Sequence, residues 1–503
     1  MGNINTMTAI VVTYFICALL LTVYGINAHI LNQLFKRRYP QRMQSDRDFL
    51  AAFYGSTPPF DHASNAAAKL PYVTTQLPIY NELNVAERLI DAVAAFDYPE
   101  GRHEIQVLDD STDEARDMVA AKVRRLQQQG IDIHHISRSD RKGFKAGALR
   151  NGLACARGDF VAIFDADFVP PADFLLQSIP FFMDNPLLGL VQARWGHLNE
   201  NESWITRLQA IGINGHFMIE QGARSTNRLF MNFNGTAGVL RKQAIIESGN
   251  WQGDTLTEDM DISYRLQLRG WQCHYLFDLV APAEIPNDLN GFKSQQFRWA
   301  KGSIQTAIKL MPCILQSSAG IFIKFQAFMH MTHFFIHPLM LFLALLAPFL
   351  LLMKTDFLSE IGLVCFGSLL ILSCTGPSRM YLVAESALGR RKLRTLFMLP
   401  LMVCFGCGLA INNSRAVLEA LIGKSSSFVR TPKCGSTNHK AYRIEKSPLI
   451  ALELIVGLWC LFGMGLYFIS EHYLIGHFML IYAVGFLYIG LISLWHAQRN
   501  ASL

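Results

Sequence analysis

Long apolar runs constrain the fold of this chain more than any other feature. The first covers residues 8–26 and is followed by the basic segment Lys36-Arg37-Arg38. About 20 apolar residues are needed for a helix to cross the hydrocarbon core of a membrane. Four later runs also reach that length, and they cover residues 334–353, 357–376, 449–470 and 474–495. The sequence therefore predicts an integral multi-pass membrane protein with the lipid bilayer as a partner.

The placement of basic residues predicts the topology. Lys and Arg gather where apolar runs end, so the net charge of +6 reflects positive-inside topology and not a nucleic-acid partner. We place the N-terminus outside and the long polar segment in the cytosol. A shorter apolar run at 396–411 precedes a loop, 423–447, that is rich in Lys and Arg. Because that loop should be cytosolic, we interpret the run as an interfacial helix.

The segment 36–315 has the pattern of an α/β domain. Short β-rich apolar runs at 72–77, 105–108, 131–136, 160–164 and 190–193 alternate with helix-like stretches such as 85–96 and 114–129. This pattern predicts a mostly parallel sheet covered on both faces, which binds ligands at the carboxyl ends of its strands. The predicted parts are an N-terminal transmembrane helix (1–35), the cytosolic domain (36–315), a segment with interface helices and two transmembrane helices (316–448), and a C-terminal transmembrane hairpin (449–503).

Carboxylates follow two of the predicted strands. Asp165 and Asp167 come directly after the run 160–164, where they suit a site for Mg²⁺ or Mn²⁺ completed by a diphosphate. Taken alone, such a pair is more often only a polar strand end. Asp109 and Asp110 follow the strand at 105–108, where they can accept hydrogen bonds from a nucleobase or ribose. They can also cap the next helix, and the two roles are compatible.

Three further motifs supply a base, a cation and an aromatic face. Glu258 and Asp259 precede a helix-like run, and the helix dipole alone could explain them. A base is needed beside a metal–diphosphate site if a hydroxyl attacks there, and Asp259 is our choice. Arg298 can bind a diphosphate through two nitrogens, and the neighbouring Trp299 can stack on a sugar ring, although both could instead anchor the domain to lipid headgroups. Lys145 lies in a glycine-rich turn that suits a phosphate.

These motifs, taken in order, resemble the membrane-bound, inverting family 2 glycosyltransferases of the cellulose synthase superfamily. The similarity is greatest to the plant cellulose synthase-like A and C groups, which make mannan, glucomannan or glucan backbones, and it extends from about residue 71 to 302. The matching segments are QLPIYNE (76–82), QVLDDSTD (106–113), KAGAL (145–149), FDADF (164–168), VQARW (191–195), FNGTAG (233–238), EDMD (258–261) and QQFRW (295–299).

The resemblance implies a GT-A catalytic domain with a site role for each matching residue. The residues implied to bind the nucleotide sugar are Pro78, Tyr80, Glu82, Asp109, Asp110, Lys145, Asp165, Gln295 and Arg298. Asp165 and Asp167 would hold the metal, and Asp259 would be the catalytic base. The acceptor would contact Gly235, Thr236, Glu258 and Trp299. Phe428, Thr431 and Lys433 resemble a gating loop, with Arg430 where the family has a valine.

The resemblance implies transfer of glucose or mannose to a growing β-linked polysaccharide, with processive translocation. The donor would be GDP-mannose, GDP-glucose or UDP-glucose, and the membrane would be the bacterial inner membrane or the Golgi membrane. A second interpretation is a single-addition enzyme that makes a glycolipid on ceramide or diacylglycerol. A third, a catalytically silent membrane partner, is disfavoured because carboxylates at buried strand ends are costly to desolvate. The sequence leaves accessory subunits open.

Overall fold

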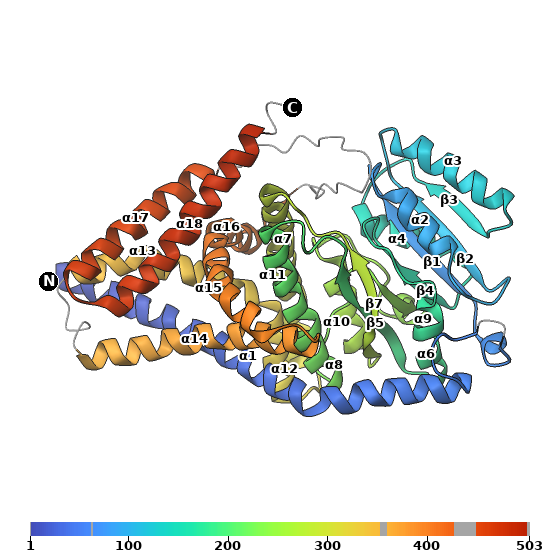
Figure 1. Cartoon of the computed structure of the whole chain (residues 1–503), viewed down its shortest axis with the longest axis horizontal. Coiled ribbons are helices and arrows are strands. Elements are labelled where there is room, and N and C mark those ends of the chain that lie inside the picture. Colours follow the sequence, from blue (N-terminus) through green and yellow to red (C-terminus); the bar gives the residue numbers. More distant parts are fainter. Residues whose placement is uncertain (1, 62–63, 353–359, 427–448, 500–503) are drawn as a thin grey trace.

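A computed structural model describes residues 2–61, 64–352, 360–426 and 449–499. Figure 1 shows a bundle of long helices at one end of the molecule and a sheet covered by helices at the other. Helix α1 (Gly2–Tyr54) runs along one side of both parts. It packs against the bundle helices α13 (Ile336–Leu352) and α14 (Glu360–Ala387) and then against strand β7 (Gln272–Ala283). The predicted boundary between residues 35 and 36 therefore falls inside one continuous helix.

The sheet has seven strands in the order β3-β2-β1-β4-β6-β5-β7. The five predicted strands are present, and their bounds are β1 (Val73–Ile79), β2 (His103–Asp109), β3 (Ile133–Ser137), β4 (Phe160–Ile163) and β5 (Leu188–His197). We did not predict β6 (Gly238–Arg241) or β7. Strand β6 pairs antiparallel with β4 and with β5, and the other described strand pairs are parallel. The predicted mostly parallel GT-A fold is confirmed.

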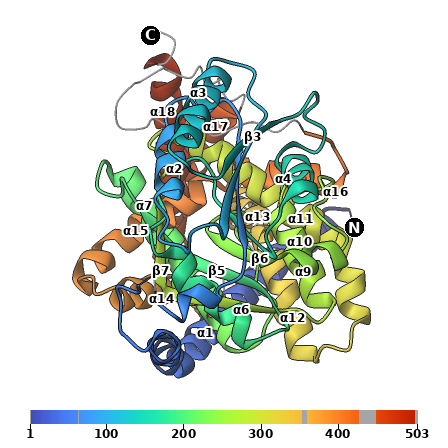
Figure 2. The same ribbon diagram turned by 90° about the vertical axis from the view of Figure 1, so that its right-hand side faces the viewer.

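Helices cover both faces of the sheet, as predicted (Figure 2). Helices α2 (Ala86–Ala94) and α3 (Ala115–Gln128) share one core with Val107, and α4 (Phe144–Cys155) shares the other with Leu108. Successive side chains of a strand point to opposite faces. Because Val107 and Leu108 of β2 are both apolar and buried, helices can pack on both faces of the sheet. The shorter helical elements of this domain are α5 (Phe174–Ser178), α6 (Pro180–Asp184), α7 (Trp204–Asn214), η2 (Gly215–Gln221), α8 (Gly222–Thr226) and α9 (Lys242–Glu247).

Four helices in the described part are long and apolar enough to cross a membrane, namely Thr8–Tyr54, His333–Leu351, Ile450–Ile469 and Tyr473–His496. They contain the predicted runs 8–26, 334–353, 449–470 and 474–495 almost completely. Helices α15 (Lys392–Gly408) and α16 (Ala410–Leu421) meet at a 43° bend and make a fifth span if they act as one. The predicted run 357–376 begins outside the described residues and continues in α14. The interfacial position of the run 396–411 stays a prediction.

Helix α11 (Leu289–Gln316) connects the two parts of the molecule. It packs against α10 (Glu258–Leu268) on one side and against α16 and α18 (Tyr473–Arg499) on the other, and α12 (Ile321–Met331) follows it. Lys293 Nζ lies 2.5 Å from Glu453 Oε1 of α17 (Ile450–Ile469), and Lys301 Nζ lies 3.0 Å from Glu419 Oε2 of α16. Both pairs are buried, and losing one partner of such a pair is costly. The position of α11 is therefore fixed relative to the bundle.

Candidate active site

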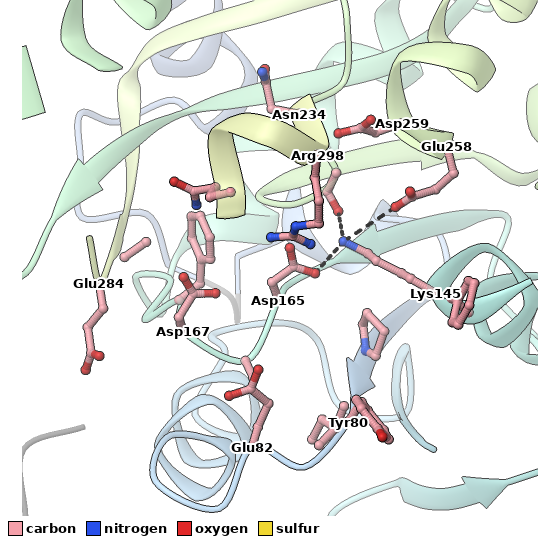
Figure 3. Close-up of a pocket in the computed structure, with 18 of the residues that line it drawn as sticks. Tyr80, Glu82, Lys145, Asp165, Asp167, Asn234, Glu258, Asp259, Glu284 and Arg298 are labelled. Carbon is pink, nitrogen blue, oxygen red and sulfur yellow. Dashed lines mark hydrogen bonds and ion pairs between the residues drawn. The ribbon is translucent and has the colours of Figure 1, made fainter. Parts of the chain in front are cut away.

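A cavity of about 220 Å³ opens at the carboxyl ends of β1, β2 and β4. The beginning of α10 and the middle of α11 close its opposite side, so the cavity lies where the sheet meets the helix that leads to the bundle. Figure 3 shows charged side chains from these elements pointing into one space. Among the buried polar atoms in the lining, Gln295 Oε1 and Trp195 Nε1 have no hydrogen-bond partner within the described residues. Such atoms suit a polar ligand.

The wall after β1 and β2 combines aromatic and charged groups. Pro78, Tyr80 and Glu82 line the cavity where β1 ends, and the guanidinium of Arg141 lies 3.2 Å from the centre of the Tyr80 ring. Asp110 also lines the cavity, but its carboxylate accepts from both Nε (2.9 Å) and an Nη of Arg138. The sequence did not predict this ion pair. Its consequence is that Asp110 reaches the cavity as part of a neutral pair.

Asp109 lies behind the cavity wall. Its Oδ1 accepts from the Ser111 amide at 2.9 Å, and its Oδ2 lies 2.9 Å from His135 Nε2. Burial would raise the pKa of this carboxyl, but the hydrogen bonds from His135 and Ser111 outweigh burial and lower it. Asp109 does not line the cavity, and it orders the turn that begins at Ser111. These contacts are those of a residue that caps the turn after β2, and the Asp109 carboxylate does not face the cavity.

Lys145, at the beginning of α4, joins three segments. Its ammonium pairs with Asp165, donates to the carbonyl oxygen of Gly235 at 2.8 Å, and lies 3.9 Å from Glu258 Oε1 (Figure 3). Burial alone would lower its pKa, but the carboxylates of Asp165 and Glu258 outweigh burial and raise it. Lys145 therefore remains a cation at neutral pH, in a position where it can meet an anionic ligand.

Asp165 and Asp167 follow β4 and line the same cavity. The Asp165 amide donates to Thr236 Oγ1 at 2.9 Å, so Thr236, itself fully buried, positions this turn from behind. The described residues contain no group of three or more carboxylate, His or Cys side chains that could hold a metal alone. Two carboxylates facing a cavity fit Mg²⁺ or Mn²⁺, because these ions take few protein ligands and complete their shell with phosphates and water.

Glu258 and Asp259 are the first two residues of α10. Both line the cavity, and burial raises the pKa of each. For Asp259 the raised value is about 7, with burial as the main cause and the neighbouring Glu258 charge as the next. A carboxylate with a pKa near neutrality binds and releases a proton at the pH of a cell. Asp259 is therefore suited to general base catalysis.

The middle of α11 supplies Gln295, Arg298 and Trp299 to the cavity. Trp299 also packs on the side that faces Ala416 and Val417 of α16, so it lies between the cavity and the bundle. One helical turn further, a Cβ on Gly302 would lie 2.8 Å from the backbone nitrogen of Thr257. Only a residue without a side chain allows α11 to approach the start of α10 this closely. Gly302 thus brings Arg298 and Trp299 beside Asp259.

The segment before β6 forms the remaining side. Gly235 has φ +81°, and a Cβ there would lie 3.0 Å from Asp259 Oδ2 and 3.4 Å from Lys145 Nζ. Glycine is needed both for the conformation and for the space. Asn234 also lines the cavity, and its amide is held by Gln221 Nε2 at 2.5 Å and by His216 Nε2 at 3.0 Å. These two hydrogen bonds hold the Asn234 side chain in place at the cavity wall.

The structure brings most of the predicted residues together, because all of those that it describes, except two, line the cavity. Asp109 and Thr236 lie behind its wall, and Phe428, Thr431 and Lys433 lie outside the described residues. The cavity residues that we did not single out as site residues include Arg141, Trp195, His197, Asn234 and Glu284. Asn234 and Trp195 belong to two of the family-matching segments, so the resemblance could have identified them as site residues. Arg141, His197 and Glu284 come from loops and strand ends without a motif.

Comparisons with known proteins identify the family of the chain. Residues 71–302 match a family model described as glycosyltransferase like family 2. Glucomannan 4-beta-mannosyltransferase 7 of Arabidopsis thaliana is 34% identical over 450 residues, which cover 86% of this chain and 79% of that protein. Glucomannan 4-beta-mannosyltransferase 2 of the same plant is 35% identical over 390 residues, which cover 76% and 71%.

A solved structure that this chain resembles is the mannosyltransferase PcManGT from Pyrobaculum calidifontis in complex with GDP-Man and Mn²⁺. Its TM-score is 0.47 at 19% identity, and the match covers 80% of this chain and 100% of that one. The family model and the two long plant matches make this chain a hexosyltransferase that uses a nucleotide sugar. The chain belongs to the family 2 glycosyltransferases, in the cellulose synthase-like A group that contains the glucomannan 4-beta-mannosyltransferases.

Proposed function

We propose that the chain transfers mannose from GDP-mannose to the end of a growing β-1,4-linked glycan and inverts the anomeric configuration. The names of two long plant matches, both glucomannan 4-beta-mannosyltransferases, support mannose as the sugar and the β-1,4 linkage. GDP-glucose and UDP-glucose are the competing donors. The site suits one-step displacement because its candidate base and its candidate metal ligands come from different walls of one cavity.

The observation that carries this proposal is the environment of Asp259. It lines the same cavity as Asp165, Asp167 and Trp299, and burial raises its pKa to about 7. In the proposed reaction, Asp259 takes the proton of the acceptor hydroxyl as that oxygen attacks the anomeric carbon of the donor. A base with a pKa near the working pH is efficient for this step. Metal binding at Asp165 and Asp167 would supply charge that stabilises the diphosphate leaving group.

Two cations of the cavity, Lys145 and Arg298, would stabilise the diphosphate leaving group. Lys145 and Arg298 both face the space beside Asp165, and Arg298 lies in the field of the carboxylates of Glu258 and Asp165. When the sugar leaves the nucleoside diphosphate, negative charge grows on the diphosphate. Cations held in position before the reaction stabilise that charge without reorganising. Tyr80, Glu82 and the Asp110–Arg138 pair lie further along the wall, where we place the nucleoside.

Several contacts support delivery of the polymer toward the membrane. Trp299 packs between the cavity and α16, and α11 is held to the bundle by the Lys293–Glu453 and Lys301–Glu419 pairs. An acceptor whose last sugar stacks on Trp299 would have its chain directed toward the bundle. We therefore propose processive synthesis coupled to translocation, with the catalytic domain in the cytosol and the helices in a Golgi membrane or a bacterial inner membrane.

A donor screen with product analysis tests the proposal. Purified full-length protein is incubated with Mn²⁺ or Mg²⁺ and each labelled donor, and the product is digested with a β-1,4-mannanase or a β-1,4-glucanase. The expected result is a polymer made from GDP-mannose and degraded by mannanase, with none from an Asp259→Asn variant. A single-sugar glycolipid as the only product would replace the polymer proposal with the second interpretation. An α linkage would contradict inversion.

A further inference from the structure

A second cavity lies outside the active site, between α1, α14 and α15. It is a groove of about 540 Å³. Its cationic members are Lys36 of α1, Arg379 of α14 and Lys392 of α15, and the other lining residues are Leu382, Val383, Ser386, Ala387, Leu393 and Leu396. No carboxylate lines this groove as the described residues form it. The groove therefore combines positive charge with an apolar surface.

The three cations of the groove lie at a similar depth relative to the predicted membrane. Lys36 follows the apolar run 8–26 of α1, and Arg379 follows the apolar part of α14, of which 357–376 is the predicted span. Lys392 precedes the apolar run 396–411 of α15. Three separate helices therefore place a cation where an apolar run meets polar sequence. Because α1 continues from here to the catalytic domain, this level is the boundary on the side of that domain (Figure 1).

The charges of the groove are available to a ligand. Lys36 and Lys392 are exposed and form no ion pair within the described part of the chain. The contact recorded for Arg379 is a 3.5 Å approach to His29 Nδ1. The nearest carboxylate on α14, Glu385, is buried and is bound by Asn214 at 2.7 Å and by Arg390 at 3.3 Å. No described acid therefore neutralises the three cations.

The groove is also preformed. The turn between α14 and α15 is held by Arg390, whose guanidinium lies 2.6 Å from Glu200 and 3.3 Å from Glu385. Arg390 therefore faces the catalytic domain and not the groove, and it fixes the two helices where they meet. The side chains of Leu393 and Leu396 on α15 are 69% and 51% exposed, respectively. Exposed leucines beside cations at a membrane boundary suit acyl chains, which run parallel to the apolar helix surface.

We propose that this groove binds an anionic phospholipid. The phosphate would lie among Lys36, Arg379 and Lys392, and the acyl chains would lie along Leu393 and Leu396. Three cations without a counter-charge favour a lipid with net negative charge over a zwitterionic one, because a choline or ethanolamine group would add a fourth cation. Basic pockets between helices at the cytoplasmic boundary commonly recognise anionic headgroups. The proposal concerns lipid binding and does not depend on which sugar is transferred.

The test measures lipid retention by the full-length protein. Wild type and variants are equilibrated with mixed micelles of phosphatidylcholine and phosphatidylglycerol, and bound lipid is identified by native mass spectrometry. The groove variant is Lys36→Gln/Arg379→Gln/Lys392→Gln. The matched control is Arg37→Gln/Arg391→Gln/Arg394→Gln, which removes three charges from α1 and the start of α15 but none from the groove lining.

The wild type and the control should retain phosphatidylglycerol in preference to phosphatidylcholine. The groove variant should bind it about a hundredfold more weakly, since one cation at an anionic surface changes affinity by roughly fivefold. Retention by the groove variant, or an equal loss in the two triple variants, would overturn the proposal. If the triple variant does not fold, Lys36→Gln and Lys392→Gln test it separately, because both side chains are exposed. Each should then weaken binding by roughly fivefold, and unchanged binding in both would also overturn the proposal.

Discussion

Lys145 donates a hydrogen bond to the carbonyl oxygen of Gly235 at 2.8 Å, and the same ammonium pairs with Asp165. This contact ties the wall that carries the candidate metal ligands to the wall where the acceptor is expected. The two residues are ninety positions apart in sequence, so a single side chain joins two walls of the cavity that are distant in the chain.

Lys145→Met should lower kcat/KM for the donor by about 10²- to 10³-fold, because one positioned donor to a developing negative charge is worth that much. It should also raise the pKa of Asp259 further, since Lys145 lowers it in the wild type. Steady-state kinetics across pH measure both effects. Lys142→Met is the control, since Lys142 precedes the same helix but does not line the catalytic cavity. An equal loss in the two variants would contradict the role of Lys145.

Asp259→Asn should abolish transfer and leave donor binding largely intact, because a general base commonly contributes about 10²- to 10⁴-fold. In the wild type, kcat/KM should rise as pH increases through about 7, where Asp259 of the free enzyme loses its proton. Product formation and calorimetric donor binding, measured with both proteins between pH 5.5 and 8.5, provide the data. Full activity in the variant would exclude Asp259 as the base.

The raised pKa of Asp259 predicts that the stability of the protein depends on pH. A carboxyl whose pKa is raised on folding contributes most to stability below its ordinary pKa, and this contribution is lost as pH rises through the folded value of about 7. Asp259→Asn removes the charge that folding disfavours. The melting temperature of the variant relative to wild type should therefore be higher at pH 8 than at pH 5. Thermal unfolding at the two pH values measures this difference, and the opposite order would be inconsistent with a raised pKa.

Gly235→Ala should reduce activity far more than it reduces stability. The left-handed conformation costs a non-glycine residue about 1–2 kcal/mol, and the new Cβ would also press on Asp259 and Lys145. Gly130→Ala is a matched control, because Gly130 has φ +87° but a Cβ added there would meet no atom within 4 Å. Both variants should lose similar unfolding free energy in denaturant titrations, and only Gly235→Ala should lose transfer. Comparable activity in the two would argue against close packing at Gly235.

Removal of divalent metal by a chelator should stop transfer, and Mn²⁺ or Mg²⁺ should restore it. Asp167→Asn should raise the metal concentration needed for half-maximal donor binding on the order of tenfold or more. Calorimetry with a non-hydrolysable donor at several metal concentrations measures this without relying on turnover. Donor binding that is insensitive to metal in both proteins would rule out the proposed metal site.

The sequence alone determined the features that depend on short stretches of chain. Apolar runs of bilayer length predicted the membrane helices, and runs of four to six β-rich residues ending in acids placed Asp110, Asp165 and Asp167 at strand ends. Both patterns are local, because a strand or a span is specified by consecutive residues. The family motifs then predicted that Asp259 and Trp299 belong to one site, and both residues line the cavity.

Tertiary structure decided how those residues are used. Only the packed chain shows that Arg138 neutralises Asp110, that Asp109 and Thr236 lie behind the wall, and that Asn234 and Arg141 reach the cavity. The pKa of Asp259 depends on its burial beneath α11, whose residues lie about forty positions away. Desolvation and charge pairing are properties of the space between distant segments. They arise when those segments pack, and no local pattern in any one of them specifies them.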